Sequence, residues 1–201
     1  MKILLVGNTG TIGAAVQQLL MTHGHQVLGA SHHSGQYRID LSDPASIKTV
    51  LAAAGQLDAI VCTAGLANFG HLASLHDADF QLGLRNKLMG QINLLRLGQD
   101  FLHDHGSVTL TSGVLAQHPM TGSAVISMVN AGLEGFTRAA ALELPRGLRI
   151  NTVSPVFVTE TAAIMGMDTG NTLSAADTAK AYLSSVEGAM NGQILDARAY
   201  A

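Results

Sequence analysis

Three glycines at intervals of three residues are the clearest candidates for chemistry in this chain. Gly7, Gly10 and Gly13 follow a short apolar run over residues 2–6 and precede a run with helical spacing. Glycine permits a tight turn and a close backbone approach to a ligand, and the free N–H groups of a following helix can bind a pyrophosphate. The pattern predicts a dinucleotide-binding loop. Its expected ligand contacts are Gly7, Asn8, Thr9, Gly10, Thr11, Ile12 and Gly13.

The residues after the second expected strand bear on which dinucleotide fits. An acidic residue at this place would accept hydrogen bonds from the 2′-hydroxyl of the adenosine ribose and repel a 2′-phosphate. The stretch instead reads Ser31, His32, His33, without a carboxylate. The sequence therefore favours NADP(H) over NAD(H), and we expect these three residues to lie beside the adenosine ribose.

Alternating apolar and helical runs predict the elements that position this loop. Strands are expected at residues 2–6, 25–30, 37–40, 57–62, 106–111, 148–153 and 193–196. Helices are expected from the glycine loop to about residue 23, from residue 44, at 77–101 and 123–144, briefly within 160–173, and from residue 175. The alternation predicts an α/β fold with a doubly wound parallel sheet in three layers, α/β/α. We expect one domain over residues 1–201, with its ligand beyond the carboxyl ends of the strands.

Two of these helices carry start signals. Asp43 is expected to be an N-cap, because Pro44 follows it and suits the first helical position. Ser174 is expected to cap the last helix, with Asp177 three residues later completing a capping box.

Composition excludes several classes of function. The 201 residues carry a formal net charge of −3 and 12% charged residues, which gives no indication of nucleic acid or an anionic membrane as partner. The single cysteine, Cys62, allows no internal disulfide and suits a reducing compartment. No apolar run has the length of a signal peptide or a membrane span, so we expect a cytoplasmic protein. The scattered histidines do not form a set of three or four metal ligands, and no metal is expected.

Several further segments, together with the glycine loop, resemble the short-chain dehydrogenase/reductase family over nearly the whole chain. They are Asp40-Leu41 followed by Asp43, Thr63-Ala64-Gly65, Thr111-Ser112, and residues 131–144, 149–161 and 192–196. The resemblance implies a Rossmann fold and an NAD(P)(H)-dependent oxidoreductase that acts on a small carbonyl or alcohol. It places Asp40, Leu41, Thr63, Ala64, Gly65, Pro155 and Val158 beside the cofactor. It also implies a homodimer or homotetramer, because the family commonly pairs the helices expected here at residues 77–101 and 123–144.

The same resemblance exposes replaced catalytic positions. The family uses a Tyr and a Lys four residues apart, and these positions hold Ile126 and Asn130, so the usual proton relay is absent. Ser112 matches the family's catalytic Ser, although its spacing to Ile126 is one residue longer than usual. Lys87 matches the family's catalytic Asn, with Asn86 as the alternative one residue earlier.

Lys87 and Asn130 therefore look exchanged between two helices, which would keep a positive charge near the nicotinamide ribose. His118 follows Ser112 in the next loop and is the local candidate for a replacement proton donor, because histidine titrates near neutral pH. Three readings stay open at this point: an oxidoreductase that uses Ser112 with a water or His118, a nicotinamide-nucleotide-binding or sensing protein without turnover, and a structural partner of an active relative.

Overall fold

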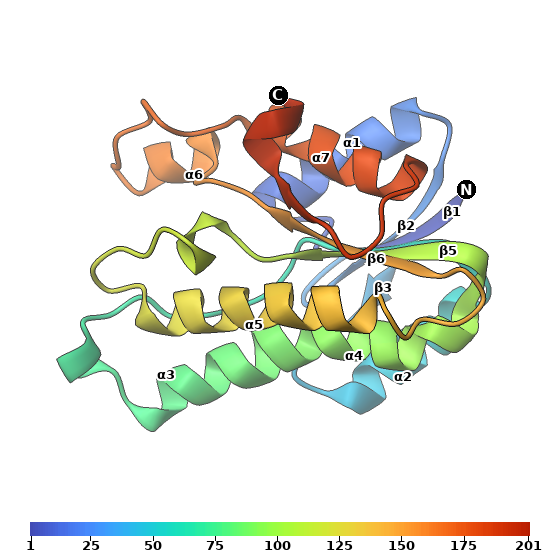
Figure 1. Ribbon diagram of the computed structural model, residues 1–201, viewed down its shortest axis with the longest axis horizontal. Coiled ribbons are helices and arrows are strands. Elements are labelled where there is room, and N and C mark those ends of the chain that lie inside the picture. The colour runs from blue at the N-terminus through green and yellow to red at the C-terminus, as the bar shows by residue number, and fades with distance from the viewer.

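Seven parallel strands form the centre of the molecule in the computed structural model, which describes residues 1–201 (Figure 1). The strands are β1 (Lys2–Val6), β2 (Gln26–Ser31), β3 (Tyr37–Arg38), β4 (Leu57–Cys62), β5 (Leu102–Thr111), β6 (Arg149–Ser154) and β7 (Ile194–Asp196). Their order in the sheet is β3-β2-β1-β4-β5-β6-β7. The direction of winding reverses between β1 and β4, and this is where an open parallel sheet binds its ligand.

Helices cover both faces of this sheet, as Figure 1 shows. One layer contains α1 (Thr11–Thr22) and α7 (Ala175–Glu187), and the other contains α2 (Pro44–Ala54), α4 (Met89–Gly98) and α5 (Ala124–Ala140). The short helix α3 (Asp77–Leu82) leads directly into the run that contains α4, and α6 (Thr159–Ile164) lies in the connection after β6 (Figure 1). The predicted doubly wound, three-layer fold is confirmed. None of the helices is both long and apolar enough to cross a membrane.

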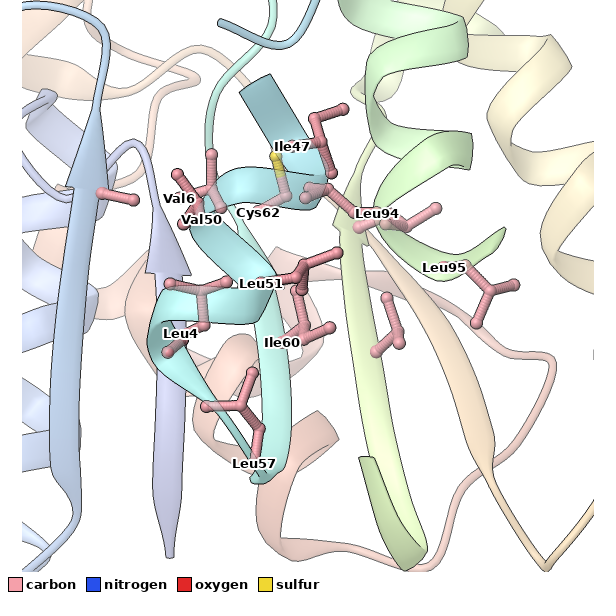
Figure 2. Packing of buried hydrophobic residues seen from close by; sticks show 14 of the residues in the cluster. Leu4, Val6, Ile47, Val50, Leu51, Leu57, Ile60, Cys62, Leu94 and Leu95 are labelled. Carbon is pink, nitrogen blue, oxygen red and sulfur yellow. The ribbon is translucent and has the colours of Figure 1, made fainter. Parts of the chain in front are cut away.

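The core is divided by the sheet into two apolar layers. In β1, Leu4 and Val6 join the cluster under α2 and α4, whereas Ile3 and Leu5 join the cluster under α1 and α7. Figure 2 shows Leu4 and Val6 in the first of these layers, with side chains of α2, α4 and β4 around them. Because both faces are covered, β1 and β4 are nearly continuous apolar runs, whereas β5 places Ser107, Thr109 and Thr111 in its buried part.

Two of the long expected elements have different limits in the structure, and a third contains a turn of another helix type. The helix expected at 77–101 has these limits, but a π-helical turn over Gly83–Leu88 lies between α3 and α4, and its last turn, Gln99–Phe101, is 3₁₀. The strand expected from residue 106 begins at Leu102, although that part is mostly exposed and has no apolar signature. The helix expected at 123–144 ends at Ala140, and Leu142 beyond it is 87% exposed.

Asp43 caps α2 as expected, since its side chain accepts hydrogen bonds from Ala45 N at 2.9 Å and Ser46 N at 3.3 Å. We predict that Asp43→Ala lowers the free energy of unfolding by about 1 kcal/mol, a fall of about 2–4 °C in Tm for a domain of this size. Calorimetry checks this, with Asp43→Asn as the control because asparagine can also cap. Equal losses in both variants would contradict the capping role.

Candidate functional site

The glycine loop packs directly against the turn that follows β4. Gly7 has a φ of +91°, and a Cβ there would lie 2.8 Å from Thr63 Oγ1. A Cβ on Gly13 would lie 2.0 Å from the carbonyl oxygen of Gly7. The N-cap of α1 is Gly10, and no side chain caps this helix. The N–H groups at the start of α1 are therefore free of side-chain acceptors, which fits a pyrophosphate.

A cavity of about 570 Å³ lies at the carboxyl ends of the strands beside this loop. It brings together eleven of the residues that the sequence assigned to the cofactor: Gly7, Thr9, Gly10, Ser31, His32, His33, Asp40, Leu41, Thr63, Ala64 and Gly65. The reasoning from sequence missed the other lining residues, Val6, Ile39, Ser42, Leu66, Leu82 and Asn86, of which Asn86 was named only as an alternative to Lys87. A cavity of this size and place suits a nucleotide.

The remaining expected cofactor residues do not line this cavity. Asn8 donates from Nδ2 to Gln17 Oε1 at 2.9 Å and lies against Gly29, so its side chain braces the loop. Thr11 and Ile12 begin α1, Pro155 follows β6, and Val158 is buried and bridges to Leu173.

Asn86 and Lys87 are neighbours in the π turn, but their side chains bind different parts of the molecule. Asn86 Oδ1 accepts from Leu66 N at 2.8 Å, and its Nδ2 donates to Ser42 Oγ at 2.9 Å. Asn86 thus ties two of the loops that line the cavity. Lys87 points instead to the end of β5, where its Nζ lies 3.4 Å from the carbonyl oxygens of both Thr111 and Ser112.

The Lys87 ammonium is buried without a counter-ion. The residue is 7% exposed and forms none of the molecule's salt bridges. Its stem packs on Gly65, where a Cβ would lie 2.7 Å from Lys87 Cγ. Burial disfavours the charged form and lowers the pKa of Lys87 from 10.5 to about 8. This amine can therefore gain or lose a proton near physiological pH.

Asn130, on α5, reaches the same strand end from another helix. Its Nδ2 lies 3.5 Å from the carbonyl oxygen of Gly113, one residue beyond the two carbonyls that Lys87 approaches. Its Oδ1 is buried and has no hydrogen-bond partner. A buried acceptor without a donor fits a ligand that brings a hydroxyl or amide, and a nicotinamide riboside carries both.

Ser112 does not present its hydroxyl to the cavity. Ser112 Oγ donates to Glu134 Oε1 at 2.9 Å, and Gln117 Nε2 donates to the other carboxylate oxygen. Burial raises the pKa of Glu134. The residue that faces Asn130 is Gly113, because a Cβ there would lie 3.0 Å from Asn130 Nδ2. Glu134 was missed from the sequence, and its signal was an acidic residue within the buried face of an apolar helix.

His118 lies in a different place from the other candidate catalytic residues. It is exposed and lines a second cavity of about 350 Å³, together with Val114, Gln117, Arg138, Ser154, Ile194, Asp196 and Arg198. It does not line the cavity beside the glycine loop.

Thr111 is held rigidly from three sides at the end of β5. Gln91 accepts from Thr111 N at 2.8 Å and donates to Thr111 O at 2.9 Å, as a neighbouring strand would. The Thr111 hydroxyl donates to Cys62 O and lies 2.6 Å from the hydroxyl of Tyr182. Tyr182 is fully buried and burial raises its pKa, so its hydroxyl fixes the strand end on which Lys87 rests.

Known proteins share both the sequence pattern and this architecture. A family model described as enoyl-(acyl carrier protein) reductase matches residues 6–190. The short-chain dehydrogenase/reductase ATR9 of Stachybotrys chlorohalonatus is 29% identical over 77% of this chain and 72% of its own, and the 3-oxoacyl-[acyl-carrier-protein] reductase FabG of Escherichia coli is 28% identical over 78% and 73%.

The similar solved structures include two that each cover 98% of this chain. The protein lin1944 from Listeria innocua is 39% identical, with a TM-score of 0.94 over 98% of its length. A small-chain dehydrogenase in complex with NADPH is 28% identical, with a TM-score of 0.87 over 95% of its length. Sequence and fold agree with the glycine loop and the strand ends described above, and the chain belongs to the short-chain dehydrogenase/reductase family.

Proposed function

We propose that this protein is an NAD(P)(H)-binding oxidoreductase that acts on a small carbonyl or alcohol. The observation that carries the proposal is the cavity of about 570 Å³ at the glycine loop, of whose 17 lining residues eleven were assigned to the cofactor from the sequence. The relative solved with NADPH supports a nicotinamide nucleotide as the ligand. When bound, the nicotinamide supplies or accepts hydride, and the protein positions it.

The residues around the strand ends have distinct parts in this proposal. The glycine loop and the start of α1 bind the pyrophosphate. Lys87 and Asn130 present a cation and an acceptor toward the nicotinamide ribose, which keeps the charge that the family's Lys provides. Pro155 and Val158 bound the nicotinamide end. Since Ser112 is engaged by Glu134, a water molecule is the simplest replacement for the missing Tyr, and a role for His118 requires it to leave the second cavity.

A direct binding titration tests the proposal. Calorimetry with purified protein is expected to show micromolar binding of NADPH and weaker binding of NADH. Absence of binding of either nucleotide up to millimolar concentration would overturn it. A nucleotide-binding protein without turnover, the alternative raised by Ile126 and Asn130, is distinguished by NADPH oxidation against a panel of aldehydes and ketones.

The preference for NADP(H) is part of this proposal and depends on residues 31–33. We predict that His32→Asp weakens NADPH binding more than tenfold and leaves NADH binding equal or tighter, because the carboxylate would repel a 2′-phosphate. The ratio of the two dissociation constants measures this. Gln18→Asp, on the exposed side of α1, is the control for added charge and should leave the ratio unchanged. An unchanged ratio in His32→Asp would contradict this placement of the ribose.

Self-association through the long helices is proposed as well. Met89 on α4 and Met128 on α5 are each 39% exposed, which supports an apolar contact on this layer. Light scattering during size-exclusion chromatography is expected to give the mass of a dimer or tetramer, and the mass of a monomer at every concentration loaded would overturn it.

A further inference from the structure

Lys87 stands apart from the other three lysines of the chain. Lys180 pairs with Asp177 at 2.7 Å, Lys2 donates to the carbonyl oxygen of Ala54 at 2.6 Å, and Lys48 is exposed. Lys87 is buried and has only two contacts with carbonyl oxygens, both at 3.4 Å. A buried charge with only two long contacts costs free energy of folding, and such a charge indicates a binding or catalytic site.

Burial shifts the pKa of the titratable groups near Lys87 toward their neutral forms. From β4, the Cys62 thiol is buried and its pKa is raised to about 12. From α7, the Tyr182 hydroxyl reaches Thr111 and its pKa is also raised. From α5, Asn130 is neutral, and Glu134 lies behind Ser112 with its charge disfavoured by burial. Lys87, with a pKa of about 8, changes its charge between pH 7 and 9.

Lys87 lies where the nicotinamide half of the proposed ligand is expected. Its stem packs on Gly65, which lines the cavity, and its Nζ rests at the end of β5. In a doubly wound sheet the ligand extends from the glycine loop across these strand ends. The nicotinamide ring carries a positive charge when oxidised and none when reduced. A cation fixed at this place therefore interacts differently with the two redox forms.

We propose that charged Lys87 makes the site select the reduced nucleotide over the oxidised one, and that loss of its proton abolishes this selection. The inference rests on the proposed function, because it needs a nicotinamide nucleotide in the cavity. It predicts a site that binds the reduced cofactor more tightly than the oxidised one at pH 7 and that loses this preference at pH values above the pKa of Lys87. For two like charges in a partly buried site, we expect about a tenfold effect on the affinity ratio.

The test compares the dissociation constants of NADPH and NADP⁺ by calorimetry at pH 7 and pH 9. The 2′-phosphate is common to both nucleotides, so its own titration cancels in their ratio. In the wild-type protein, the preference for NADPH should fall about tenfold from pH 7 to pH 9. Lys87→Arg keeps its charge and should keep the preference at both values, whereas Lys87→Met should show the low preference at both. Lys48→Met, which removes an exposed lysine from α2, should behave as wild type.

A second measurement follows the amine itself. With only four lysines, spectra of protein carrying ¹³C-labelled lysine give few signals, and the one missing in Lys87→Met belongs to Lys87. Its titration midpoint should be lower in the NADP⁺ complex than in the NADPH complex. Equal midpoints in the two complexes, or an affinity ratio that does not change with pH in the wild type, would overturn the proposal.

These outcomes are separable from a failure of the proposed function. If neither nucleotide binds to the wild-type protein at either pH, the proposed function fails, and the selection that depends on it is overturned as well. If both bind with a ratio independent of pH and of Lys87, the function stands and only the selection is wrong. Circular dichroism spectra confirm that each variant is folded before its affinities are compared.

Discussion

Replacing Gly13 with alanine is expected to abolish nucleotide binding and to lower the free energy of unfolding by about 3 kcal/mol or more, since no side chain can relieve the clash. The added Cβ would lie 2.0 Å from the carbonyl oxygen and 2.7 Å from the carbonyl carbon of Gly7, as well as 2.7 Å from Thr63 Oγ1. Two of these three atoms are backbone, so the loop itself would have to move away from α1. The same movement would displace the turn after β4, which forms the opposite wall of the cavity.

A matched change elsewhere separates this clash from the general effect of replacing glycine. Gly135, on α5, has no atom within 4 Å of an added Cβ, so Gly135→Ala should stabilise the helix by about 0.5–1 kcal/mol. Thermal unfolding and calorimetry with NADPH compare the two variants. If Gly13→Ala melts and binds as wild type does, the contact between the glycine loop and α1 is not as close as the structure shows.

The fold could be predicted because its signals are local. The strand expected at residues 57–62 is observed as Leu57–Cys62, since a run of apolar residues of that length has few alternatives. Asp43 and Ser174 cap helices as expected, because capping depends on residues only two or three positions away. The eleven expected residues that line the cavity gather there once the strands are parallel, since parallel strands end at one edge.

The directions of the side chains at the site could not be predicted in the same way. Successive residues in a strand point to opposite faces, so Thr111 meets Tyr182 of α7 while Ser112 meets Glu134 of α5. Matching Ser112 to the family's catalytic Ser by residue type does not give the direction of its side chain. The sequence indicated a difference only through the spacing from Ser112 to Ile126, which is one residue longer than usual. Similarly, the π turn that contains Lys87 changes the direction in which its side chain leaves the helix. The turn begins at Gly83, which packs closely on Val125 of α5, and a contact between residues so far apart in the chain has no local signal.

Lys87→Met is expected to raise the free energy of unfolding at pH 7 by on the order of 3 kcal/mol, because it removes a buried charge that has no counter-ion. The pKa of Lys87 is lowered from 10.5 to about 8 on folding, so the folded state holds this proton less tightly than the unfolded chain does. The charge therefore opposes folding fully below pH 8. Its cost diminishes as the pH rises from 8 to 10.5, where both states lose the proton.

Urea unfolding of the wild type and Lys87→Met at pH 7 and pH 10 measures this difference, with Lys48→Met as the control that should give no pH-dependent gain. The advantage of Lys87→Met should be large at pH 7 and small at pH 10. If Lys87→Met is less stable than wild type at pH 7, the two contacts with Thr111 and Ser112 outweigh the burial of the charge. A lysine that costs stability at the end of β5 and selects the redox form of a nucleotide is the expected compromise at a functional site, where stability is given up for a charge that the ligand uses.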